Sequence, residues 1–86
     1  MSNLIFTEQA WEEYLYWQAQ DKRICKRINA LLKDINRHSF QGIGKPEPLK
    51  NYDGYWSRRI DDCHRLVYRI SNGQIEIIQC KGHYQS

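Results

Sequence analysis

Apolar residues recur at helical spacing in the segment that follows Asp21. The stripe keeps an i, i+4, i+7, i+8, i+11 rhythm, and its members are Ile24, Ile28, Leu31, Leu32 and Ile35. A period near 3.6 residues indicates an amphipathic helix with one buried face. The carboxylate of Asp21 can accept a hydrogen bond from an unpaired backbone N–H of the first turn, so we expect the helix to begin directly after it.

A second, earlier helix is predicted from Thr7 to about Gln20. Its apolar face is formed by Ala10, Trp11, Tyr14 and Leu15, and the Thr7 hydroxyl is a suitable N-cap. Phe6 precedes the cap and Trp11 stands four residues after it, which is the spacing of a hydrophobic staple. Before the cap, Leu4-Ile5-Phe6 is predicted to form a short strand that leads into the helix.

The second half of the chain favours strands. Residues 40–48 are rich in Gly and Pro, so helix cannot persist there. Three antiparallel strands are expected after this loop, joined by turns at residues 61–63 and 71–73: Tyr55 to Ile60, His64 to Ile70, and Gln74 to about Gly82. Two helices followed by strands predict a single α+β domain over residues 1–86, with both helices on one face of a small, mainly antiparallel twisted sheet.

Side chains alternate between the two faces of a strand. On the central strand, one face carries Leu66, Tyr68 and Ile70, and the other carries Arg65, Val67 and Arg69. On the last strand, Ile78 and Cys80 share one parity, and the opposite parity is shared by Ile77, Gln79, Lys81 and His83. Arg65 and His83 are therefore expected together on the face without helices, with Arg59 or Arg58 adding charge.

Charge is unevenly distributed along the 86 residues, whose net charge is +3. Residues 1–21 hold four acids and no Lys or Arg, whereas residues 22–50 hold eight bases and two acids. This asymmetry suggests a polyanion or an acidic protein as partner. The cations of the second helix fall opposite its apolar stripe, where they form either a solvated face or a contact with RNA backbone or a ribosomal surface: Lys22, Lys26, Lys33 and Arg37.

The cysteines and the hydropathy pattern exclude several classes of protein. Cys25, Cys63 and Cys80 are odd in number, far apart and without a CxxC pair, so neither a disulfide framework nor a metal site is expected. Cys25 and Cys80 are interpreted as small core residues. No stretch approaches the ~20 apolar residues of a membrane span, and no signal-peptide pattern begins the chain. We expect a cytoplasmic protein with no membrane contact and no cofactor.

Three charged residues stand out as a set that could cleave RNA without a metal. Glu47 lies between two prolines and is the only acid from Ile35 to Tyr52. In a cleavage by 2′-hydroxyl attack, Glu47 fits the general base and His83 the general acid. Arg65 fits the cation that holds two phosphate oxygens, because its guanidinium is a planar fork.

Each member of this set has a simpler interpretation. Loop glutamates are commonly solvated, strand arginines commonly pair with a neighbouring acid, and histidines near a chain end commonly lie on the surface. His38 and His64 are interpreted as structural residues, at a helix end and at a strand start.

Several segments resemble the Txe/YoeB toxins of bacterial toxin–antitoxin pairs. They begin with Trp11-Glu12-Glu13-Tyr14-Leu15-Tyr16-Trp17 and Asp21-Lys22-Arg23-Ile24. They continue with Gly44-Lys45-Pro46-Glu47-Pro48-Leu49-Lys50, Tyr55-Trp56-Ser57-Arg58-Arg59-Ile60, His64-Arg65-Leu66-Val67-Tyr68 and the closing His83-Tyr84. The resemblance covers nearly the whole chain.

This resemblance implies a compact microbial-ribonuclease-like fold of the RelE-type superfamily. It also implies endonucleolytic cutting of mRNA, chiefly in the ribosomal A site, which inhibits translation. On matching positions it makes Glu47 the general base, His83 the general acid, Arg65 the phosphate-stabilising cation and Tyr84 a residue that orients or stacks on substrate. Weaker matches as RNA contacts are Lys50, Arg58 and Arg59.

The family further implies a cognate antitoxin that covers the site, with operator DNA bound only through that antitoxin. A homodimer is left open. Two other functions stay open beside the endoribonuclease. One is a non-catalytic toxin of the same fold that binds a protein target such as gyrase, although gyrase-poisoning relatives lack a matching glutamate–arginine–histidine set. The other is a passive RNA-binding module.

Overall fold

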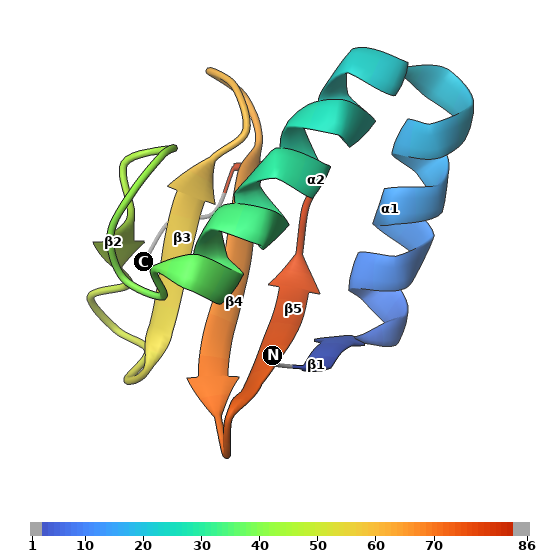
Figure 1. The fold of residues 1–86 in the computed structure, drawn as a ribbon. Coiled ribbons are helices and arrows are strands. Elements are labelled where there is room, and N and C mark those ends of the chain that lie inside the picture. The colour runs from blue at the N-terminus through green and yellow to red at the C-terminus, as the bar shows by residue number, and fades with distance from the viewer. Residues whose placement is uncertain (1–2, 84–86) are drawn as a thin grey trace.

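The computed structural model describes residues 3–83 and arranges them as two helices on an open sheet (Figure 1). The elements are β1 (Asn3–Phe6), α1 (Glu8–Gln20), α2 (Lys22–Arg37), β2 (Glu47–Pro48), β3 (Tyr55–Arg59), β4 (Arg65–Ser71) and β5 (Gln74–Gln79). Within this range the strand order is β1-β5-β4-β3-β2, with β1 parallel to β5 and the other neighbours antiparallel. The predicted α+β class, with helices on one face of a mainly antiparallel sheet, is confirmed.

Both helices begin at the caps that the sequence indicates. The Thr7 hydroxyl accepts a hydrogen bond from the N–H of Ala10, and the Asp21 carboxylate accepts from the N–H groups of Arg23 and Ile24. The rings of Phe6 and Trp11 meet edge to face with centroids 5.7 Å apart, as the staple spacing predicts. These contacts fix the angle at which the chain leaves β1 and enters α1.

The core lies between α2 and the sheet. All five residues of the α2 stripe contribute to it, with Ile28, Leu31 and Ile35 fully buried. In α1, however, the buried residues are Ala10 and Trp17, whereas Trp11 is 47% exposed and Leu15 is 38% exposed. The predicted apolar face of α1 is therefore wrong for Trp11 and Leu15. The helix packs against α2, β5 and β1 at one side of the sheet (Figure 1), and only Ala10 and Trp17 of its residues are buried there.

A β-bulge in β5 changes the predicted side-chain alternation. Tyr68 pairs with Ile77 and Val67 pairs with Gln79, so Ile78 is an extra residue without an opposite partner. A bulge shifts parity by one position. Consequently Ile77 and Cys80 are both buried in the core, and the prediction that Ile77 faces away from the helices is wrong.

The hairpin between β4 and β5 has the predicted turn. Asn72 and Gly73 connect the pair Ser71–Gln74, with φ values of 53° and 73°. Two consecutive positive φ values are typical of the type I′ turn that Asn-Gly favours. This short turn sets the register that carries β5 past the bulge toward His83.

No helix within residues 3–83 has the length and apolar character needed to cross a membrane.

Candidate active site

A polar pocket of about 210 Å³ brings together most of the charged residues singled out in the sequence. Its lining consists of Lys45, Glu47, Pro48, Leu49, Lys50, Ser57, Arg59, Arg65 and His83. These residues come from the loop around β2, from β3, from the start of β4 and from the segment after β5. The pocket therefore joins one carboxylate, four permanent cations and one imidazole that lie far apart in the sequence.

Glu47 reaches the pocket because its loop is tied to the edge of the sheet. The Glu47 backbone pairs with Ser57 in β3, and the Leu49 N–H donates to the carbonyl of Tyr55 at 2.8 Å. Just before it, Gly44 and Lys45 both have positive φ, 81° and 50°. Lys45 has a Cβ and precedes a proline, so its left-handed backbone is sparsely populated and must be imposed by its surroundings.

Arg65 is oriented by the turn between β3 and β4. Its Nη1 donates to the carbonyl of Asp61 at 2.7 Å and to that of His64 at 3.1 Å. The turn is closed by the Asp61 carboxylate, which accepts hydrogen bonds from the N–H groups of Cys63 and His64. This leaves the Nη2 and Nε edge of the Arg65 guanidinium without a hydrogen bond to residues 3–83.

Arg59 stands directly opposite Arg65 across the β3–β4 pair. Among residues 3–83 the ion pairs are Arg58–Asp34 and Arg69–Glu76, so none of the pocket cations is held in an ion pair with a described residue. Unpaired cations around a concave surface favour an anionic ligand, and a phosphodiester is one. Lys50, one of the weaker candidates for an RNA contact, lines the same surface.

His83 completes the pocket from the end of the described chain. It follows Gly82, whose carbonyl accepts a hydrogen bond from the N–H of Arg65 at 3.0 Å. The prediction that Arg65 and His83 share the helix-free face agrees with this arrangement, since both line the pocket. Tyr84, the fourth residue of the predicted catalytic set, lies outside the described residues.

Arg58 does not belong to the pocket, and its predicted role as an RNA contact needs correction. Its side chain is fully buried on the helix side of β3. The guanidinium pairs with Asp34, and its other acceptors are the Tyr68 hydroxyl and the carbonyls of His38, Gln41 and Ile43. Because adjacent strand residues point to opposite faces, only Arg59 of the two neighbours can reach the pocket.

The ion pair of Arg58 also shapes the acid–base properties of its partners. The hydrogen bond from Arg58 lowers the pKa of the Asp34 carboxyl below its usual value. Burial raises the pKa of the Tyr68 phenol, whose hydroxyl donates to the carbonyl of Ser39. This network connects α2, β3, β4 and residues 38–43, and so it stabilises the fold behind the pocket.

Among the polar residues that line the pocket, sequence reasoning missed two, Lys45 and Ser57. For Ser57 the signal was available, because it shares strand parity with Arg59. Lys45 is adjacent to Pro46 and Glu47, but its direction depends on the positive φ values of the loop, which no periodicity reveals.

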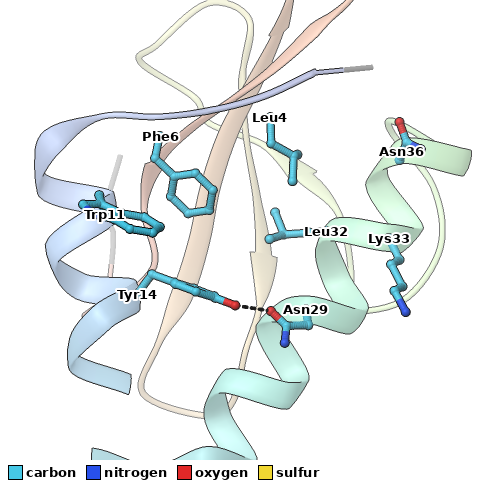
Figure 2. A pocket seen from close by; sticks show the side chains of 8 residues that line it. All are labelled: Leu4, Phe6, Trp11, Tyr14, Asn29, Leu32, Lys33 and Asn36. Carbon is cyan, nitrogen blue, oxygen red and sulfur yellow. Dashed lines mark hydrogen bonds between the residues drawn. The ribbon is translucent and has the colours of Figure 1, made fainter. Parts of the chain in front are cut away.

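A larger hollow, of about 530 Å³, lies on the opposite side of the molecule between β1, α1 and α2 (Figure 2). Its walls are mostly apolar: Leu4, Phe6, Trp11, Tyr14 and Leu32, with Asn29, Lys33 and Asn36 at the α2 side. The Tyr14 hydroxyl donates to Asn29 Oδ1 at 2.7 Å across the groove. Despite its size, this apolar groove lacks the carboxylate, imidazole and arginine that the smaller pocket holds.

The buried thiol of Cys80 does not add a second reactive site. Cys80 is buried and its thiol donates to the carbonyl of Ala10, and burial raises the pKa of this thiol to about 12. A thiol with such a pKa stays protonated and unreactive near neutral pH. Within residues 3–83, no three His, Cys, Asp or Glu side chains gather closely enough to hold a metal ion.

Comparisons with known proteins agree on one family. Residues 6–84 match the model of the YoeB-like toxin of bacterial type II toxin–antitoxin systems. The curated toxin YoeB of Escherichia coli K12 is 55% identical over 82 residues, which cover 94% of this chain and 98% of that protein.

Solved structures agree as well. A YoeB/ParE toxin from Agrobacterium tumefaciens superposes with a TM-score of 0.93 at 47% identity, covering 95% of this chain and 99% of that one. A YoeB dimer from Staphylococcus aureus gives 0.91 at 52% identity, over 96% and 98% of the two chains. A YoeB–YefM complex from the same organism gives 0.89 at 50% identity, over 98% and 99%. The chain belongs to the YoeB family of toxins from bacterial type II toxin–antitoxin systems.

Proposed function

We propose that this toxin is a metal-independent endoribonuclease that cleaves mRNA in the ribosomal A site and so inhibits translation. The observation that carries the proposal is the meeting of Glu47, Arg65 and His83 at one pocket of about 210 Å³. A base, an acid and an unpaired cation around one anion-sized space are what phosphodiester cleavage by an internal nucleophile requires.

The reaction begins at the 2′-hydroxyl next to the scissile phosphate. Glu47 accepts the hydroxyl proton while the 2′ oxygen forms a bond to phosphorus. The bond from phosphorus to the 5′ oxygen breaks, and His83 gives its proton to that leaving oxygen. The products are a 2′,3′-cyclic phosphate and a 5′-hydroxyl. Positioned acids and bases each contribute roughly 10²–10⁴-fold to such a step.

Arg65 stabilises the charge that develops on the phosphate oxygens during this step. The hydrogen bonds to the Asp61 and His64 carbonyls hold the guanidinium before substrate arrives, so no reorganisation is needed when charge appears. In the proposal Tyr84 orients or stacks on the RNA, and Lys50 and Arg59 contact its backbone. The same cations make the pocket favourable for RNA even before chemistry begins.

The proposed partners follow from the relatives. The Staphylococcus aureus protein was solved as a YoeB–YefM complex and as a dimer, so we propose a cognate antitoxin for this chain and leave open a homodimer. Contact with operator DNA is expected only through the antitoxin. The apolar groove suits protein contact, because exposed apolar surface such as Trp11 and Leu4 is typical of interfaces. The cytoplasm, where ribosomes and mRNA meet, is the proposed site of action.

The test is the chemistry of the product ends. Purified toxin is mixed with ribosomes that carry an mRNA, in enough Mg²⁺ to keep the ribosomes intact. If the toxin also cuts free RNA, a second reaction with a short RNA is run in EDTA. The proposal predicts 2′,3′-cyclic or 3′-phosphate ends and 5′-hydroxyl ends. Cleavage that leaves 5′-phosphate ends would contradict it, because such ends come from attack by water rather than by the 2′-hydroxyl.

Two isosteric variants give the matched control. Glu47→Gln removes the proposed base without changing shape, whereas Glu12→Gln removes an exposed charge on α1 outside the pocket. The first should lose about 10²–10⁴-fold in single-turnover rate and the second should keep it. Equal rates in both variants would contradict the role of Glu47, and RNA binding without cleavage by the unaltered toxin would indicate a passive RNA-binding module.

A further inference from the structure

Residues 80–82 connect β5 to His83, and side chains of α1 hold the start of this connection. Glu13 Oε1 accepts a hydrogen bond from the N–H of Cys80 at 2.8 Å. Trp17 Nε1 donates to the carbonyl of Cys80 at 2.9 Å. Both backbone groups of Cys80 are thus bound by one helix, directly after the strand ends at Gln79.

The end of the connection is held by His64 and Arg65. His64 Nδ1 accepts a hydrogen bond from the N–H of Gly82 at 2.8 Å, and the N–H of Arg65 donates to the carbonyl of Gly82 at 3.0 Å. Gly82 has a φ of 92°, a conformation that glycine adopts without steric cost. Both backbone groups of Gly82 are therefore fixed by the two residues that begin β4 or lie just before it.

The His64 ring is itself immobilised. It packs edge to face on Trp17, with ring centroids 4.8 Å apart at 73°, and it is half-buried. Because Nδ1 accepts a hydrogen bond, that nitrogen carries no proton and the ring proton of the neutral form lies on Nε2. His64 thus supplies an acceptor of defined direction to Gly82, the residue directly before His83 in the chain.

We propose that His64 is a positioning residue for the general acid: it fixes the Gly82 peptide and thereby places the His83 imidazole against the leaving 5′ oxygen. The inference rests on the proposed function, in which His83 is that acid. His64 does not line the pocket, so in this proposal it acts on the RNA only through His83. If the Nδ1 acceptor of His64 is removed, the only remaining hydrogen bond of the two is the one from the Arg65 N–H to the Gly82 carbonyl. The backbone just before His83 can then rotate about that one bond.

Three substitutions separate the acceptor from the ring. His64→Asn keeps an acceptor, Oδ1, at the place of Nδ1. His64→Gln carries its acceptor one bond further out, near the place of Nε2. His64→Leu keeps bulk against Trp17 without any acceptor. If positioning depends on the hydrogen bond to Gly82, activity must follow the place of the acceptor rather than the polarity or size of the side chain.

The experiment measures single-turnover cleavage, and binding to an RNA whose scissile nucleotide lacks the 2′-hydroxyl, below the melting temperature of every variant. An ångström-scale displacement of a catalytic group can cost about 10²-fold, so His64→Leu and His64→Gln should lose about that much in rate with unchanged affinity. His64→Asn should recover most of the loss. Unchanged cleavage by His64→Leu, or a His64→Asn variant as slow as His64→Leu, would overturn the proposal.

A second measurement does not depend on cleavage. In uniformly ¹⁵N-labelled toxin, a hydrogen bond from the Gly82 amide to an imidazole nitrogen gives a through-bond ¹⁵N–¹⁵N coupling between Gly82 and His64 Nδ1. We expect this coupling in the unaltered protein, and its absence would overturn the inference even if RNA is cut. Conversely, the coupling together with a toxin that cuts no RNA would contradict the proposed function and leave the contact intact.

Discussion

At the scale of single residues, the two neighbouring arginines of β3 have different environments. Arg58 and Arg59 are identical in chemistry, yet Arg58 is fully buried and pairs with Asp34, whereas Arg59 is exposed and lines the pocket. Strand alternation predicts that the two point in opposite directions, but it does not say which one faces the helices. That depends on the register with β4 and on an acid, Asp34, that comes from 24 residues earlier in the chain.

The two arginines give a matched pair of variants. Arg58→Ala should lower the free energy of unfolding by about 3 kcal/mol or more, because it removes the donor from the partly buried Asp34 carboxylate and from three backbone carbonyls. Arg59→Ala should change it by no more than about 0.5 kcal/mol, since the residue is exposed, while weakening RNA binding. Urea denaturation measures the first effect and titration with RNA the second. Equal stability of the two variants would contradict the structural role of Arg58.

The Asp34–Arg58 pair also predicts a pH dependence of stability. The pKa of Asp34 is lowered in the folded protein by Arg58, so the unfolded chain takes up a proton at higher pH than the folded one. The stabilisation is therefore complete above the unfolded value of about 3.9 and is lost as pH falls through the folded pKa. Urea denaturation at pH 7 should show that Asp34→Asn has a lower free energy of unfolding than the unaltered protein. As the pH falls from 7 to 3, the variant should then lose less of this free energy than the unaltered protein. Parallel curves would contradict this contribution.

At the scale of elements, the sequence predicted those features that depend on residues close together in the chain. The stripe of α2, both N-caps and the Asn-Gly hairpin appear in the structure as predicted. The bulge at Ile78, the two-residue β2 and the parallel pairing of β1 with β5 could not be predicted, because each depends on how a partner strand is placed and not on the local pattern. For the same reason, the exposure of Trp11 follows from where α1 is placed rather than from its own spacing.

The loop before β2 offers a test at this scale. A Cβ on Gly42, where φ is 114°, would stand 1.9 Å from Asp34 Oδ2, whereas Gly54, with φ of 82°, has open space around it. Both substitutions to Ala incur the left-handed backbone cost of about 1–2 kcal/mol. Gly42→Ala should therefore be the more destabilising, by up to about 3 kcal/mol, because it also displaces the Asp34–Arg58 pair. Thermal denaturation of the two variants compares them, and equal melting temperatures would contradict the account.

At the scale of the whole molecule, the sheet separates two surfaces. Helices and the core cover one face (Figure 1), and the residues of the charged pocket belong to the other. The apolar groove lies between β1 and the two helices (Figure 2). The sequence predicted that Arg65 and His83 share a face, and it singled out Glu47 as the only acid from Ile35 to Tyr52. It could not predict that the loop of Glu47 would fold back onto β3 to close the pocket, because that depends on the two-residue pairing of β2.

This arrangement predicts the salt dependence of RNA binding. Each phosphate contact to a single strand lowers log K by about 0.7 per unit of log[salt], so the four pocket cations together predict a slope of about −2.8. In a His83→Ala background, which slows cutting enough for a binding titration, Lys50→Ala should reduce the slope for a short oligonucleotide by about 0.7. Lys26→Ala, on the exposed face of α2, should leave it unchanged. A smaller slope for Lys26→Ala together with an unchanged slope for Lys50→Ala would indicate that RNA binds at α2 and not at the pocket.

The central claim, that His83 gives a proton to the leaving oxygen, has a direct test in a substrate whose 5′ oxygen at the scissile bond is replaced by sulfur. A thiolate leaves without being protonated, so the acid becomes dispensable while the base does not. The account predicts that His83→Ala, slow on the ordinary RNA, cleaves the sulfur substrate at nearly the rate of the unaltered toxin, whereas Glu47→Ala stays slow on both. A His83→Ala variant equally impaired on both substrates would contradict the account.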